Sequence, residues 1–158
     1  MLRIGKLTDY ATVILATLAG ERARMQNASS IAERTGISAP TVSKLLKQLN
    51  RAGLVSSTRG TRGGYQLARS ADDISAASIL DALEGPLALT DCSVGTGHCC
   101  LEHSCTVGRT WQRLNVAIRK SLSEISLAQL AGLDARAPSI PIERELKQFT
   151  RAKAAPGS

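Results

Sequence analysis

Residues 29–53, SSIAERTGISAPTVSKLLKQLNRAG, contain a short helical pattern, a glycine and then a longer helical pattern. Gly36 separates the two patterns where the chain must turn sharply, and glycine tolerates the positive φ that such a turn needs. Pro40 suits the first turn of the second helix, and Gly53 suits its C-terminal cap. Apolar side chains at helical spacing should form the buried side of this helix-turn-helix: Ile31, Ala32, Ile37, Val42, Leu45 and Leu49.

Polar side chains occupy the other side of the second helix. Six of these residues are expected to point outward: Ser38, Thr41, Ser43, Lys44, Lys47 and Gln48. A helix face of this kind can enter the major groove of DNA, where its N-terminal residues reach base edges. An ordinary helical hairpin with a solvated face is the alternative interpretation of this segment.

A glycine-rich hairpin is predicted directly after the second helix. Leu54–Ser57 and Tyr65–Leu67 are short and β-like, and the six residues 59–64 between them include three glycines. Arg59, Arg62 and Arg69 surround this hairpin, and guanidinium groups on a narrow hairpin can bind phosphate or enter a minor groove. The two elements together predict a winged helix-turn-helix, which counts against the plain hairpin.

Three further helices are expected around this unit. The first runs from Thr8 or Asp9, either of which could cap it, to about Gly20. The second covers residues 74–83. The third is long, beginning at Val107 and ending near Gly132, with one apolar stripe formed by Trp111, Leu114, Ile118, Leu122 and Ile125.

The apolar stripe of the long helix needs a partner to cover it. An antiparallel second copy is the simplest partner, because it also brings two reading helices to one side of a homodimer. DNA half-sites would then lie about 34 Å apart, or a multiple of that distance.

Composition and charge are consistent with this interpretation. The formal net charge is +7, which favours phosphate backbones or anionic membranes as partners. Arg3 and Lys6 precede an apolar run at residues 11–19, as in a secretory signal, but Asp9 and the helical periodicity favour a soluble amphipathic helix. Since no run approaches the roughly 18–20 apolar residues of a membrane helix, we expect a cytoplasmic protein without membrane partners.

Four cysteines, Cys92, Cys99, Cys100 and Cys105, fall within 14 residues. In a reducing compartment such a group of thiolates indicates a soft-metal site, with an iron–sulfur cluster or zinc. Structural zinc prefers cysteine pairs spaced by two to four residues. Here six residues separate Cys92 from Cys99 and five separate Cys99 from Cys105, so the spacing favours a cluster. Packed free thiols are the third interpretation.

Three segments carry a resemblance to a known family: residues 31–38 (IAERTGIS), 52–57 (AGLVSS) and 59–65 (RGTRGGY). They resemble the IscR/NsrR family of bacterial cluster-sensing transcription regulators, and the likeness covers roughly residues 1–133. It implies that Arg59 enters the minor groove beside Gly63 of the wing motif. It also puts Pro40, Ser43 and Lys44 on the reading face. Some members have an acidic residue and Gln where this chain has Ser43 and Lys44, so the operator sequence does not transfer.

The same resemblance implies the metal ligands. Three loop cysteines hold the cluster in the family, which assigns Cys92, Cys99 and Cys105 to a 2Fe–2S or 4Fe–4S cluster. Cys100 could replace Cys99 or stay free. One branch adds a histidine where this chain has Gly108, and another takes an acidic residue from the first helix of the partner subunit, at the place of Asp9. His98 and His103 are further alternatives for the fourth ligand.

The resemblance and the residues together predict a mainly helical protein with a small β-wing. We expect a winged helix-turn-helix domain at 1–86, a cluster-binding loop at 87–106, a dimerisation helix at 107–133 and a flexible tail at 134–158. The loop CSVGTGHCCLEHSC at 92–105 looks most like regulators of SUF iron–sulfur assembly operons, which predicts a repressor of such genes and not an enzyme.

Four alternatives remain open at this point. Within the same kind of protein, the chain could be a zinc- or thiol-based regulator or a nitric-oxide-sensing member of the family. It could also be a thiol enzyme using a cysteine with His98 or His103, or a winged helix that recruits proteins and not DNA.

Overall fold

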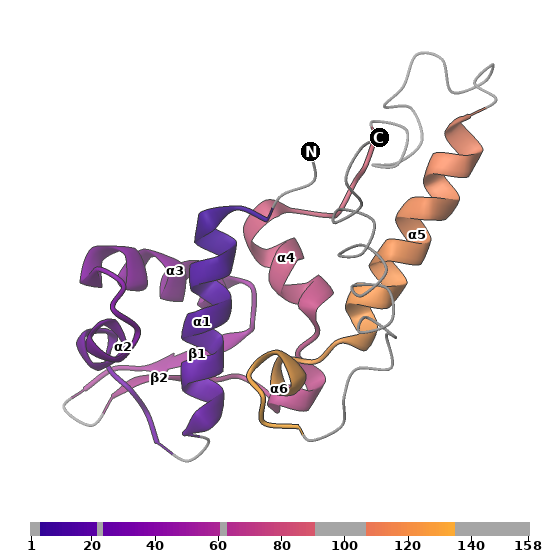
Figure 1. Cartoon of the computed structure of the whole chain (residues 1–158). Helices are drawn as coiled ribbons and strands as arrows, with labels where there is room; N and C mark the ends of the chain where they lie inside the picture. Colours follow the sequence, from indigo (N-terminus) through magenta and orange to yellow (C-terminus); the bar gives the residue numbers. More distant parts are fainter. Residues whose placement is uncertain (1–3, 22–23, 61–62, 91–106, 135–158) are drawn as a thin grey trace, which may run out of the picture.

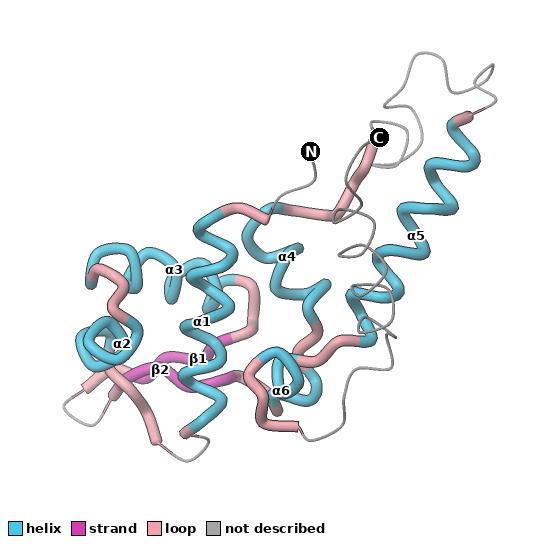
Figure 2. Tube along the Cα trace, viewed as in Figure 1, coloured by secondary structure: helices cyan, strands magenta, loops and turns pink. Residues whose placement is uncertain are grey.

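The computed structural model describes residues 4–21, 24–60, 63–90 and 107–134 (Figure 1). Its elements in chain order are α1 (Lys6–Gly20), α2 (Ala28–Thr35), α3 (Ala39–Arg51), β1 (Val55–Thr58), β2 (Gly64–Leu67), the 3-10 helix η1 (Ala71–Asp73), α4 (Ala76–Glu84), α5 (Gly108–Glu124) and α6 (Leu127–Leu130). Figure 2 shows helices throughout the described chain, with strands only in the hairpin after α3. The expected fold class, mainly helical with a two-stranded wing, is confirmed.

The helix-turn-helix forms as its sequence predicts. The Asn27 side chain caps α2 by accepting a hydrogen bond from the Ser30 N–H at 2.8 Å. Gly36 ends that helix with φ +69°, and Pro40 lies in the first turn of α3. Gly53, with φ +70°, follows the end of α3, and the Leu54 N–H donates to the Leu49 carbonyl at 3.0 Å. This is the glycine-dependent cap that the pattern indicated.

A core of aliphatic side chains lies between α1, α2, α3 and the base of the wing. Of the six expected anchors, Ala32 is partly buried and the others are buried. The inner side of α1, the residue before β1 and the first residue of β1 complete this core: Ile14, Leu15, Leu18, Leu54 and Val55. Burial of this aliphatic surface is the main contribution that holds the reading helix in place.

The wing is a short antiparallel hairpin supported from one edge. Val55 pairs with Leu67 at its base and Thr58 pairs with Gly64 at its far end. Gln26, in the segment before α2, adds two backbone hydrogen bonds to Tyr65, of 3.0 and 2.8 Å. The wing is therefore attached both to α3 and to the start of the helix-turn-helix.

The start of α1 differs from the expectation. The helix begins at Lys6 with Gly5 as its N-cap, so the prediction that Thr8 or Asp9 caps it is wrong. The reason is a contact with a distant part of the chain. The Glu84 carboxylate at the end of α4 accepts hydrogen bonds from the Gly5 N–H (3.1 Å) and the Thr8 hydroxyl (2.5 Å). Asp9 is left exposed in the first turn.

The predicted single helix from residue 107 to about 132 is also wrong, because it is interrupted. Ile125 is extended after α5, and Ser126 starts α6 in a capping box with Gln129. The Leu127 N–H donates to the Ile74 carbonyl at 2.7 Å, and the Leu127 side chain is fully buried in the core. α6 packs against α1 and η1, whereas α5 leans away from the α1–α3 body and packs on α4 (Figure 1). Leu127 and Ala128 of α6 thus complete the winged-helix core.

No helix among the described residues has the length and apolar character that crossing a bilayer would need.

Candidate nucleic-acid interface

The outer side of α3 presents the polar residues expected to read DNA. Ser38, Pro40, Lys44 and Lys47 are exposed, and Thr41 and Ser43 are half-buried. The Ser38 and Thr41 hydroxyls lie 2.8 Å apart at the N-terminal end of the helix. A shallow hollow of about 380 Å³ follows the helix, lined by Pro40, Ser43, Lys44, Lys47, Gln48 and Arg51. We call these six residues with Ser38 and Thr41 the α3 face.

Gln48 is a correction to the predicted α3 face. It was expected to point outward, but its Oε1 is buried and has no hydrogen-bond partner among the described residues. The reason is its position on the helix, three residues after Leu45 and one before Leu49, both fully buried. Gln48 therefore lies at the inner edge of the α3 face, next to the core. Arg51, which the sequence analysis passed over, extends the exposed basic side of α3 instead.

The tip of the wing requires glycine for lack of space. A Cβ on Gly63 would collide with the carbonyl oxygen of Thr58, and a Cβ on Gly64 would lie 2.8 Å from the Gln26 carbonyl oxygen. The Gly63 N–H closes the turn by donating to Gly60 at 2.9 Å. Arg59 begins this turn and is exposed, while Arg62 lies outside the described residues.

One hydrogen bond joins the wing to the reading helix. The Asn50 side-chain amide in the last turn of α3 donates to the Ser57 hydroxyl in β1, at 3.0 Å. Ser57 is two residues before Arg59, so this contact helps to fix where the wing tip stands relative to α3. The sequence analysis did not identify this pair, because no local pattern relates the end of a helix to a strand.

The exposed cations of this surface are not among the ion pairs of the described residues. Those pairs are Arg34 with Glu21 and Arg119 with Asp81, each at 2.6 Å. Lys44, Lys47, Arg51 and Arg59 thus keep their positive charge toward solvent. Cations grouped on a helix and on the adjacent wing suit the phosphate groups that flank a DNA groove.

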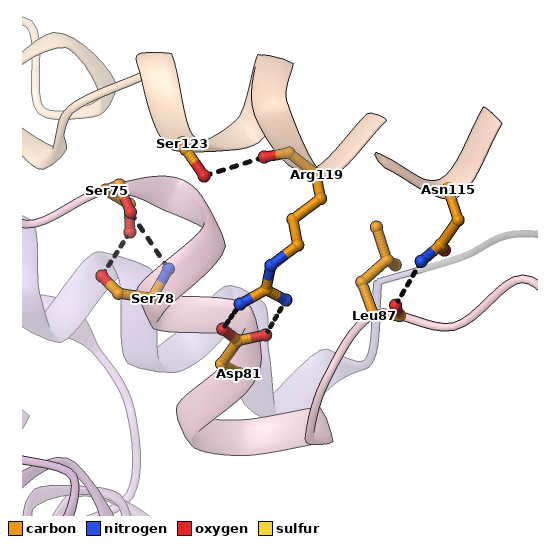
Figure 3. A network of polar contacts seen from close by, with 7 residues as sticks. All are labelled: Ser75, Ser78, Asp81, Leu87, Asn115, Arg119 and Ser123. Carbon is orange, nitrogen blue, oxygen red and sulfur yellow. Dashed lines mark hydrogen bonds and ion pairs between the residues drawn. The ribbon is translucent and has the colours of Figure 1, made fainter. Parts of the chain in front are cut away.

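A second polar site joins α5 to the rest of the chain (Figure 3). Arg119 donates two hydrogen bonds to the Asp81 carboxylate, of 3.0 and 2.6 Å. These bonds and the carboxylate charge raise the pKa of Arg119 above its ordinary value. Asn115, one turn earlier, is nearly buried and bonds to the backbone of Leu87 and Leu89. Neither residue was predicted, although two polar residues four positions apart lie on the same side of a helix and could have indicated a shared contact.

The predicted apolar stripe of α5 is only partly covered. Ile118 and Leu122 line an apolar cavity of about 310 Å³ together with Leu80, Pro86 and Leu87. Trp111 and Leu114, nearer the start of the helix, are 43% and 45% exposed. The N-terminal half of α5 therefore presents an apolar surface that the described part of the chain leaves open.

Residues 4–132 match the profile of the Rrf2 family, described as iron-dependent transcriptional regulators. The chain belongs to the Rrf2 family. NsrR of Oceanobacillus iheyensis is 32% identical over 131 residues, which are 82% of this chain and 89% of that protein. Among solved structures, CymR, the global cysteine regulator of B. subtilis, has a TM-score of 0.68 at 31% identity and covers 85% of this chain and 99% of its own. T. potens IscR has a TM-score of 0.62 at 29% identity, covering 99% and 94%.

Membership of the Rrf2 family decides the broad class of function. The chain is a helix-turn-helix transcriptional regulator of a DNA-binding family, so the prediction that it is not an enzyme is confirmed. The resemblance to IscR and NsrR regulators is confirmed at the level of the Rrf2 family, which also includes CymR among its relatives.

The metal ligands predicted for this Rrf2 chain are only partly within the described residues. Cys92, Cys99, Cys100, Cys105, His98 and His103 all lie outside them. Asp9 is described, and it is exposed in the first turn of α1. In those residues no three His, Cys, Asp or Glu side chains are grouped as metal ligands. The cysteine and Asp9 assignments stay predictions.

Proposed function

We propose that this Rrf2 protein is a cytoplasmic, homodimeric repressor of iron–sulfur cluster assembly genes whose grip on DNA depends on a bound iron–sulfur cluster. The observation that carries the proposal is a three-thiolate donor set, Cys92, Cys99 and Cys105, immediately before α5 in a chain with an exposed basic α3 face. Its similarity to T. potens IscR supports the same function.

Two parts of the winged helix would contact double-stranded DNA. In the major groove we assign Ser38, Pro40, Thr41, Ser43, Lys44 and Lys47. At the wing, Arg59 and Arg62 would bind phosphate or enter the minor groove, with Gly63 keeping the turn tight enough to fit. The hydroxyls of Ser38 and Thr41 lie at the start of α3, where a reading helix normally meets base edges, and Lys44 and Lys47 follow along its exposed side.

A second copy of the chain would cover the open half of the α5 stripe. Trp111 and Leu114 are large apolar side chains left nearly half exposed, and Val116 is 66% exposed. Burying such side chains in a symmetric pair stabilises a dimer and presents two α3 faces to two half-sites.

The residues of this chain fit an iron–sulfur cluster by their chemistry. Thiolates are the usual ligands of such clusters, and the three assigned cysteines supply three of them. Asp9 does not cap α1 and is exposed in its first turn, and we assign its carboxylate as the fourth ligand, from the partner subunit. When bound, a 2Fe–2S or 4Fe–4S cluster supplies a centre that responds to oxygen and redox conditions.

A zinc- or thiol-based regulator is the second candidate. The observation that favours it is the similarity to CymR, whose known role concerns cysteine and whose fold matches over most of this chain. The adjacent pair Cys99 and Cys100 would suit oxidation chemistry of thiols. A nitric-oxide-sensing role, in line with the relative named NsrR, would use the same cluster ligands.

Metal content of anaerobically purified protein tests the proposal. We expect the wild type to be coloured and to contain iron and sulfide, because three thiolates hold the cluster. Cys92→Ala, Cys99→Ala and Cys105→Ala should each lose most of the visible absorbance and iron.

Cys100→Ala is the matched control and should keep the colour and the iron. A colourless wild type that contains zinc would favour the second candidate. Loss of the cluster from Cys100→Ala, with retention in Cys99→Ala, would instead exchange the roles of the two neighbouring cysteines.

A further inference from the structure

Asn115 fastens a stretch of loop backbone to α5. Its side-chain Nδ2 donates to the Leu87 carbonyl at 3.1 Å, and its Oδ1 accepts from the Leu89 N–H at 3.2 Å. Figure 3 shows the first of these bonds, with Asn115 directed at the loop. Because Asn115 is only 8% exposed, both bonds are shielded from competing water. The amide thus holds two alternate residues of the loop in the way that a neighbouring strand would.

The fastened stretch lies between a bend and the cysteines. Gly85, with φ +87°, ends α4 in a backbone conformation that favours glycine. Cys92 follows Leu89 by three residues, and Gly108 starts α5 three residues after Cys105. Both chain segments that flank the cysteines are therefore attached to α5, one through the peptide chain and the other through Asn115.

The polar contacts continue from Asn115 toward α1 and the reading helix α3. Arg119, four residues later in α5, makes its two hydrogen bonds to Asp81 in α4. Glu84, three residues after Asp81, binds the Gly5 N–H and the Thr8 hydroxyl at the start of α1. Since α1 packs on α3, a continuous series of contacts leads from the loop backbone to the reading helix.

We propose that Asn115 is the positioning residue through which the state of the cysteine loop changes DNA affinity, with the Arg119–Asp81 pair as the next link. This proposal rests on the proposed function. Through the Asn115 amide, a change at residues 87–89 on gaining or losing the metal would reach α5 and, through Arg119, α4. Without the Asn115 amide, the same change would be absorbed by the bend at Gly85.

The test compares operator affinity before and after metal removal in three proteins: wild type, Asn115→Leu and the control Ser121→Ala. Ser121 is exposed on α5, and its hydroxyl donates to the Ala117 carbonyl of the same helix. The probe is promoter DNA of iron–sulfur assembly genes from the same organism. Couplings between sites commonly amount to about five- to 150-fold. For wild type and Ser121→Ala, we expect the Kd values before and after metal removal to differ by a factor in that range. For Asn115→Leu, the two Kd values should agree within about twofold.

Further measurements separate coupling from simple structural damage. Hydrogen exchange at the Leu89 amide should accelerate in Asn115→Leu and not in Ser121→Ala. Asn115→Asp, which keeps the acceptor for the Leu89 N–H, should recover part of the wild-type ratio. If Asn115→Leu does not fold, Arg119→Met serves instead, since this half-exposed ion pair can be removed without opening the core.

The outcomes are distinct. A wild-type ratio retained in both Asn115→Leu and Arg119→Met would overturn the proposal while leaving the proposed function intact. Loss of iron from Asn115→Leu would also overturn it, because Asn115 would then hold the metal site and not transmit its state. If metal removal leaves the operator Kd of the wild type unchanged, both the proposed function and this inference are wrong.

Discussion

Arg59→Ala is expected to weaken operator binding by about 1–3 kcal/mol, or roughly fivefold to 150-fold in Kd. Arg59 is exposed where the wing begins its turn, beyond the last paired residues of the hairpin, Thr58 and Gly64. Its guanidinium is thus free to bind phosphate or to enter a narrow minor groove. Fluorescence anisotropy with labelled operator at several salt concentrations measures the change. If Arg59 contacts a phosphate, the salt slope should also fall by about one unit.

Arg69→Ala is the matched control for Arg59. It removes the same exposed side chain beyond the base of the wing, two residues after Leu67 pairs with Val55. We expect its effect on operator affinity to be much smaller, and Arg59→Lys to retain part of the affinity through its charge. Operator binding by Arg59→Ala within twofold of wild type at the same salt would exclude Arg59 from the interface.

Leu127→Ala is expected to lower the free energy of unfolding by about 2–5 kcal/mol, as for other buried leucines. The Leu127 side chain is fully buried, and its N–H bonds to the Ile74 carbonyl at the edge of η1. Truncation would leave a cavity between α6 and α1 in the centre of the winged helix. Urea denaturation followed by circular dichroism at a fixed protein concentration measures the loss.

Leu130 provides the control for this substitution, since it lies on the same short helix and is 46% exposed. Leu130→Ala should cost less than about 1 kcal/mol. Equal effects of the two substitutions would contradict the assignment of α6 to the core, and would indicate that residues 127–130 belong with α5, the proposed dimerisation helix.

The helix-turn-helix could be predicted from the sequence because its signals are local. Helical spacing of aliphatic residues identified the buried side of α3, and Gly36 and Gly53 marked its limits. The wing was predictable for the same reason, since the glycines that its turn needs follow one another closely. A turn that needs glycine can be recognised in the sequence, because the residues that form it are close neighbours in the chain.

The starts and ends of α1 and α5 were predicted less well, because distant contacts decide them. α1 begins early because Glu84, 79 residues beyond Gly5, binds its first turn. The sequence around Thr8 contains no sign of that carboxylate. The end of α5 did have a local signal, the capping box of Ser126 and Gln129. The apolar stripe of α5 continues to Ile125, one residue beyond the end of the helix, and this pattern led to the prediction of a longer helix.

The candidate site also contains residues that local patterns predict and residues that they do not. The basic α3 face and Arg59 followed from helical spacing and from the glycine-rich hairpin. The cysteine assignment depends on a resemblance, and those residues lie outside the described part of the chain. Asn115 could not be predicted as a contact of Leu87 and Leu89, because 26 or more residues separate it from them.

The central claim is that a cluster held by Cys92, Cys99 and Cys105 controls how strongly the paired winged helices bind DNA. The most direct measurement is the Kd for assembly-gene promoter DNA of one anaerobic protein sample, before and after its cluster is removed. The account predicts a change of about fivefold to 150-fold. An iron-free sample that binds the promoter as tightly as the loaded protein would contradict it.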